Sequence, residues 1–123
     1  INWLKSVQDM SNGLFGEEVG NATLYNHSIA SMAMGEAYYF SKSPLLKRNV
    51  NKAASLILNA QNPYNAWRYS LEPDGDNDSS ITGWMVFALK TADEAGAQVP
   101  KDTFRGALEF LNTMIPVCLR VVI

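Results

Sequence analysis

The stretch "LILNAQNPYNAWRY" (residues 56–69) joins an apolar run, a glutamine, a short loop and an aromatic residue. The same order of residues occurs in "WLKSVQDMSNGLF" (residues 3–15), with Gln8 in the place of Gln61. The two glutamines are 53 residues apart. A unit that recurs at such a period predicts a repeat architecture, in which each unit packs on its neighbours along the chain.

A third copy of the unit begins at Pro100 and is incomplete. Phe110 takes the place of Trp3 and Leu56, but Ile115 stands where the glutamine is expected. No glycine and aromatic pair follows it. The chain therefore holds a little over two repeats.

The sequence of each repeat predicts two helices of different kinds. Residues 28–40 and 80–95 are apolar almost all round and rich in small side chains, which is typical of a helix packed on most sides. Residues 44–60 and 101–114 carry one apolar stripe each, and Pro100 is a start signal for the second. We expect inner helices of the first kind, neighbouring and roughly parallel, covered by outer helices of the second. The predicted fold class is all-α, an array of helical hairpins over residues 1–114.

Composition excludes several classes of function. The chain of 123 residues is 47% hydrophobic, enough for one packed domain, and its net charge of −2 offers no basic face for a nucleic-acid backbone. No apolar run is long enough for a membrane span. Cys118 is the only cysteine, so neither an internal disulfide nor a multi-thiolate metal site is expected. With no phosphate-binding glycine loop, the sequence predicts no cofactor. The compartment is left open.

The pattern of glutamine, loop, glycine and aromatic residue resembles the glutamine-tryptophan motif of the prenyltransferase/squalene oxidase repeat family, which includes the squalene-hopene cyclases. The resemblance spans about residues 1–114. It implies an α/α toroid, a ring of helical hairpins around a central cavity, of which this chain would form an incomplete part. It also implies that the motif residues are architectural: the glutamine bonds backbone groups of the next loop, and the aromatic residue stacks over it. On this chain the motif residues are Gln8, Phe15, Gln61 and Trp67, with Ala66 where the motif has glycine.

The resemblance also implies candidate catalytic residues. In squalene-hopene cyclases an Asp-x-Asp-Asp motif precedes an inner helix, and its central aspartate protonates the terminal alkene. Asp76 and Asp78 match this motif, with Asp78 as the proton donor, but Ser79 replaces the companion aspartate. His27, the only histidine, aligns with Ser79 one repeat earlier, so its imidazole is predicted to face Asp78. A carbocation would be steadied by aromatic ring faces, and the candidate cavity residues are Tyr25, Tyr38, Trp84 and Phe87.

The same acidic residues have two other interpretations. Asp78, Ser79 or Ser80 can cap the helix that follows. The spacing of Asp74, Asp76 and Asp78 imitates the start of an EF-hand calcium loop, but Ser79 occupies the required glycine position and Met85 the position of the bidentate glutamate. The sequence therefore predicts no metal site, and the helix cap is the favoured interpretation of Asp78. His27 is likewise more typical of a packed, hydrogen-bonded residue.

The segment "IPVCLRVVI" (residues 115–123) is an apolar tail with Arg120 as its only charge. Pro116 is expected to stop the preceding helix, and the β-branched residues favour extended pairing. We expect four side chains to bury against another copy of the chain or against further repeats: Val117, Leu119, Val121 and Val122.

Two functions follow. The favoured one is a non-catalytic or degenerate repeat module that acts in binding or assembly through its open ends, with an apolar, isoprenoid-like ligand as a possible occupant. The alternative is a slice of an isoprenoid cyclase with Asp78 as the proton donor.

Overall fold

Five helices make up the described part of the chain. The computed structural model describes the backbone of residues 1–122 and the side chains of residues 1–115. No strand occurs among these residues, and the only β-type pairing is an isolated bridge between Gln8 and Phe15. The helices are α1 (Asn2–Ser6), α2 (Ala22–Ser41), α3 (Pro44–Ala60), α4 (Ser79–Glu94) and α5 (Lys101–Val122). The predicted all-α class is confirmed.

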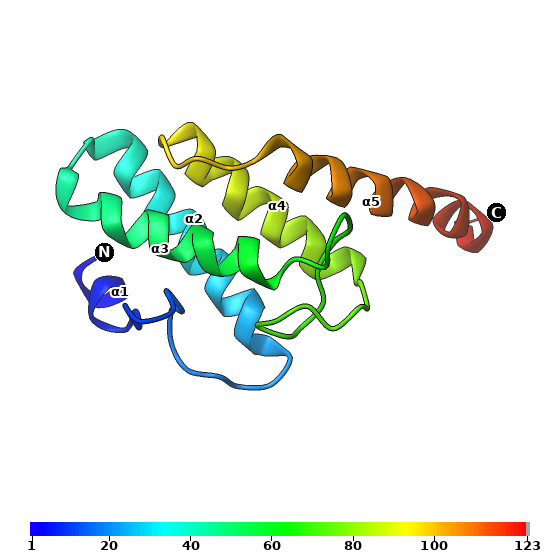
Figure 1. Cartoon of the computed structure of the whole chain (residues 1–123), viewed down its shortest axis with the longest axis horizontal. Helices are drawn as coiled ribbons and strands as arrows, with labels where there is room; N and C mark the ends of the chain where they lie inside the picture. The colour runs from blue at the N-terminus through cyan, green and yellow to red at the C-terminus, as the bar shows by residue number, and fades with distance from the viewer. Residues whose placement is uncertain (123) are drawn as a thin grey trace.

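The inner pair, α2 and α4, lies side by side at the centre of the molecule. Both run in the same direction, whereas α3 and α5 run the opposite way (Figure 1). Gly35 of α2 faces Thr91 of α4, and a Cβ at Gly35 would lie only 2.9 Å from Thr91 Cγ2. The small residues of the inner helices thus allow α2 and α4 to pack closely, as the sequence predicted.

The core lies where α3 crosses the inner pair. Its largest fully buried side chains come from all three helices and from the loop before α4, and they include Leu24, Met34, Ile57, Trp67, Ile81, Met85 and Leu89. The apolar stripe of α3 faces this core, and its charged residues lie on the opposite side, which is the arrangement that a period near 3.6 residues produces.

Both glutamines of the repeat form the same pair of hydrogen bonds. Gln8 Nε2 donates to the carbonyl of Gly13 at 3.0 Å and to that of Asn49, in α3, at 3.1 Å. Gln61 Nε2 donates to the carbonyl of Asn65 at 2.8 Å and to that of Thr103, in α5, at 3.0 Å. Each glutamine therefore fixes its own loop and ties it to the next outer helix.

The hydrogen bonds also correct the alignment of the two loops. The amide of Asp9 donates to Leu14 O, and the amide of Asn62 donates to Ala66 O. Ala66 therefore corresponds to Leu14, and the residue in the place of Gly13 is Asn65. The second loop is one residue shorter, which a simple alignment of the letters did not reveal.

The prediction that Pro116 ends the last helix is wrong. Helix α5 continues to Val122 and extends beyond the ends of the other helices (Figure 1). In the sequence, apolar residues keep a helical spacing across the proline, at Leu111, Ile115, Cys118 and Val122. The helical pattern thus continues past Pro116, although a proline removes one backbone hydrogen bond and its ring crowds the preceding turn. The predicted burial of Val117, Leu119, Val121 and Val122 lies outside the described side chains.

Candidate functional site

Asp78 is the N-cap of α4. Its Oδ2 accepts a hydrogen bond from the backbone N–H of Ile81 at 3.0 Å, and its own N–H donates to Trp67 O at 2.8 Å. An extended backbone at Asp78 places the carboxylate over the first turn, where the positive end of the helix dipole favours it. The cap expected from the sequence is present, and it ties the start of α4 to the aromatic residue of the motif.

Asp76, the second candidate acid, points outward. It pairs with Arg68, with Arg68 NH1 and Asp76 Oδ2 2.6 Å apart, and 69% of its side chain is exposed. Its backbone N–H donates to Asp74 Oδ1 at 3.0 Å. The three aspartates of the loop therefore have separate partners, and no group of three or more His, Cys, Asp or Glu side chains within the described residues could hold a metal ion.

His27 is fully buried between α2, α3 and the first loop. The N–H of Phe15 donates to its Nδ1 at 3.1 Å, so Nε2 carries the proton and donates to Ala53 O at 3.1 Å. Burial lowers the pKa of His27 to about 4, although the bond to Ala53 opposes this shift. The ring is therefore neutral at pH 7, and its nitrogens face Phe15 and Ala53 rather than Asp78.

The counterpart of His27 in the second repeat is Thr82, not Ser79. Thr82 Oγ1 accepts a hydrogen bond from Trp67 N at 3.2 Å, as His27 Nδ1 accepts one from Phe15 N. In both repeats a side chain of the inner helix thus holds the backbone of the motif's aromatic residue. The spacing between the bonded residues differs, 12 in the first repeat and 15 in the second, which explains why alignment of the sequence paired His27 with the wrong position.

The four candidate cavity aromatics lie in different settings. Tyr25 lies beside Tyr69, with 6.2 Å between the ring centroids, and Tyr38 is half-buried against the core. Trp84 and Phe87 are 38% and 60% exposed on α4. Partial burial and the carboxylate of Asp78 raise the pKa of Tyr69 above its ordinary value.

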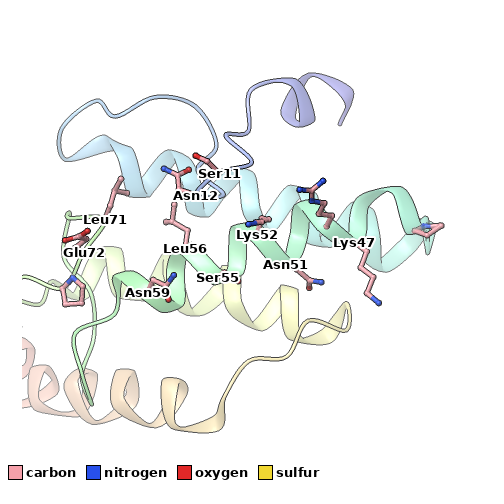
Figure 2. Close-up of a pocket in the computed structure, with 13 residues that line it drawn as sticks. Ser11, Asn12, Lys47, Asn51, Lys52, Ser55, Leu56, Asn59, Leu71 and Glu72 are labelled. Atoms are coloured by element: carbon pink, nitrogen blue, oxygen red, sulfur yellow. The ribbon is translucent and has the colours of Figure 1, made fainter.

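A groove along the outer face of α3 was not predicted. It has a volume of about 1040 Å³ and runs between the N-terminal loop and the loop that precedes α4 (Figure 2). Figure 2 shows lining side chains along α3 from Lys47 to Asn59, with Ser11 and Asn12 contributed by one loop and Leu71 and Glu72 by the other. The polar residues of α3 gave a signal in the sequence, but one wall comes from the N-terminal loop, far from α3 along the chain, and the other from the loop that connects α3 to α4.

Comparison with known proteins gives no match to a protein family, to a curated protein or to a solved structure. Among the described residues, no helix is both long enough and apolar enough to cross a membrane.

Proposed function

We propose that this chain is part of a prenyltransferase/squalene oxidase type of repeat module, arranged as an open α/α toroid segment, that acts in binding or assembly rather than in catalysis. One observation carries the proposal: the candidate acid residues are held by structural contacts. Asp78 caps α4, Asp76 pairs with Arg68 at the surface, and His27 is buried with both ring nitrogens bonded.

Protonation of an alkene needs a different environment. The acid must be kept neutral by burial and released as an anion that neighbouring groups stabilise. The exposed carboxylate of Asp76 lacks such burial, and that of Asp78 is already engaged with the N–H of Ile81. These contacts support a structural role for the acidic loop.

The inner helices offer the surface for binding. Ile29 of α2 and Trp84 and Phe87 of α4 are large apolar side chains that remain exposed although both helices are otherwise well packed. Exposed apolar surface of this kind is typical of sites that bind a ligand or another protein surface. In the proposed arrangement, α2 and α4 form the concave side of the array, and an isoprenoid chain or a further repeat covers them.

Calorimetric titration with farnesol, together with light scattering over a concentration series, tests this proposal. We expect farnesol binding, self-association or both in the parent chain, and a loss of that behaviour in Trp84→Ala and Phe87→Ala. Leu45→Ala is the matched control, because Leu45 is 73% exposed but lies on α3. A monomer that does not bind farnesol would contradict the proposal.

The cyclase alternative has its own test. Incubation with squalene should give no product, and Asp78→Asn should leave the chain unchanged in farnesol binding and association. Turnover of squalene by the parent that disappears in Asp78→Asn would overturn the non-catalytic proposal in favour of proton donation by Asp78.

A further inference from the structure

Positive charge is concentrated on one part of this acidic chain. Between Glu36 and Glu72 the sequence has no aspartate or glutamate, although it contains lysines and arginines. Three of these cations, Lys47, Arg48 and Lys52, lie on α3 and line the groove. Within the described residues, the ion pairs are made by Arg68, Lys90 and Arg105, so the three groove cations are not neutralised by a carboxylate of the chain.

The groove floor consists of two parallel rows of side chains on α3. One row is Pro44, Arg48, Lys52 and Leu56, and the other is Lys47, Asn51, Ser55 and Asn59. Successive members of a row are four residues apart, which corresponds to about 6 Å along a helix. An extended peptide advances about 6.6 Å for every two residues, so alternate residues of such a peptide keep nearly the same spacing.

The polar row is available for hydrogen bonds. Asn51, Ser55 and Asn59 are exposed. None of their side chains bonds to another residue in the described part of the chain. Amide side chains both donate and accept, as peptide groups do, so a row of them suits an extended backbone better than it suits a simple anion.

One wall of the groove is fixed by hydrogen bonds, and the charge of the lining changes from one end of the groove to the other. Ser11 and Asn12 are fixed within their own loop, because Ser11 Oγ donates to Asp9 at 2.6 Å and Asn12 Oδ1 accepts from Leu14 N at 2.9 Å. The one carboxylate of the lining, Glu72, lies at the opposite end from Lys47 (Figure 2). A bound anion is therefore drawn to the N-terminal half of α3.

We propose that the groove along α3 binds an extended acidic peptide, with its carboxylates at Lys47, Arg48 and Lys52 and its backbone at Asn51, Ser55 and Asn59. The outer face of α3 is separate from the exposed apolar residues of α2 and α4, so this site adds a second binding surface to the proposed module. Charge complementarity speeds the encounter, and the polar row recognises the peptide backbone.

Fluorescence anisotropy with a labelled synthetic peptide tests the charged half of the site. In one peptide glutamate alternates with alanine, and in the control peptide glutamine replaces every glutamate. We expect the glutamate peptide to bind, to weaken steeply as salt is added, and to lose about tenfold or more in affinity in the double variant Arg48→Gln and Lys52→Gln. The matched control is the double variant Lys90→Gln and Lys101→Gln, which removes the same charge outside the groove and should leave affinity unchanged.

A second pair of measurements distinguishes a peptide site from a patch that attracts any anion. Asn51→Ala and Asn59→Ala should weaken the glutamate peptide several-fold but leave the binding of inorganic polyphosphate unchanged. Circular dichroism checks that each variant is folded. Three outcomes would each overturn the proposal. The glutamate and glutamine peptides bind equally well, the two double variants have equal effects, or Asn51→Ala leaves the affinity for the glutamate peptide unchanged.

Discussion

The two glutamine loops make the same contact with different residues. In the first, Gly13 lies against the backbone of α3, and a Cβ there would clash with Lys52 O. In the second, Asn65 occupies the loop position, and the glycine is on the helix, where a Cβ at Gly106 would fall 2.8 Å from Asn65 O. Close approach of loop and helix requires one small residue, and either partner can supply it. Both repeats therefore have the same close contact between loop and helix, but the glycine that permits it lies on the loop in the first repeat and on the helix in the second.

The aromatic residues of the two loops give the largest expected difference. Trp67 is fully buried, and its indole Nε1 donates to Ile57 O at 2.8 Å, whereas Phe15 is buried without such a bond. We expect Trp67→Ala to reduce the free energy of unfolding by about 3–5 kcal/mol and Phe15→Ala to fall at the lower end of that range. Urea unfolding measures both.

Trp67→Phe separates packing from the hydrogen bond. The phenylalanine keeps most of the ring volume but leaves Ile57 O without the indole donor. Trp67→Phe should therefore reduce the free energy of unfolding much less than Trp67→Ala does. If Trp67→Ala unfolds at the same urea concentration as the parent, Trp67 is exposed and the repeat does not depend on it.

The pH dependence of stability should belong to the first repeat alone. His27 has a folded pKa of about 4 against an ordinary value of 6.5, so the unfolded chain binds a proton more readily between these values. The contribution of His27 to the free energy of unfolding is therefore fully present above pH 6.5. It falls by about 3 kcal/mol as the pH drops to 4. Thr82, its counterpart, does not titrate. Denaturant unfolding at a series of pH values measures the effect.

His27→Asn is the control for this pH effect, because its Oδ1 can still accept the N–H of Phe15. The variant should lose the stability change between pH 6.5 and 4. Asp9 acts mainly below this range: hydrogen bonds from Ser11 lower the pKa of its carboxyl, and the resulting stability is lost as the pH falls past the ordinary value of 3.8. A variant that keeps the full pH dependence would show that other groups cause it.

The glycines that permit the loop contacts give intermediate effects. Gly13→Ala should cost about 2–3 kcal/mol, because the methyl group meets Lys52 O and the backbone has a φ of +93°. Gly106→Ala should cost about 1–2 kcal/mol, since the clash with Asn65 exceeds the helix propensity that alanine adds.

Gly16→Ala is the reference for backbone strain alone. Gly16 has a φ of +83°, but nothing lies within 4 Å of its Cβ position, so its cost should be about 1 kcal/mol. If Gly13→Ala and Gly16→Ala cost the same, the approach to Lys52 contributes nothing, and the comparison between the two loops fails.

The sequence predicts helices best where local signals agree. The bounds of α3 match the expected 44–60, because Pro44 sets its start and the amphipathic stripe is continuous. Helix α2 begins at Ala22 rather than at residue 28, since a helix apolar on most sides has little periodicity to mark its end. The cap at Asp78 follows from a local rule, whereas one wall of the groove on α3 comes from the N-terminal loop, which lies far from α3 along the chain.

The starts of the two inner helices provide the smallest and most local comparison. Asp78 caps α4 through the N–H of Ile81, whereas Asn21, the N-cap residue of α2, makes no side-chain cap hydrogen bond. Asp78→Ala should therefore cost about 1 kcal/mol, and Asn21→Ala close to nothing. Asp78→Asn should leave stability nearly unchanged, because an asparagine oxygen can accept the same bond. Thermal unfolding of the three variants measures these differences. If Asp78→Asn destabilises the chain as much as Asp78→Ala does, this position requires the negative charge and not the cap hydrogen bond.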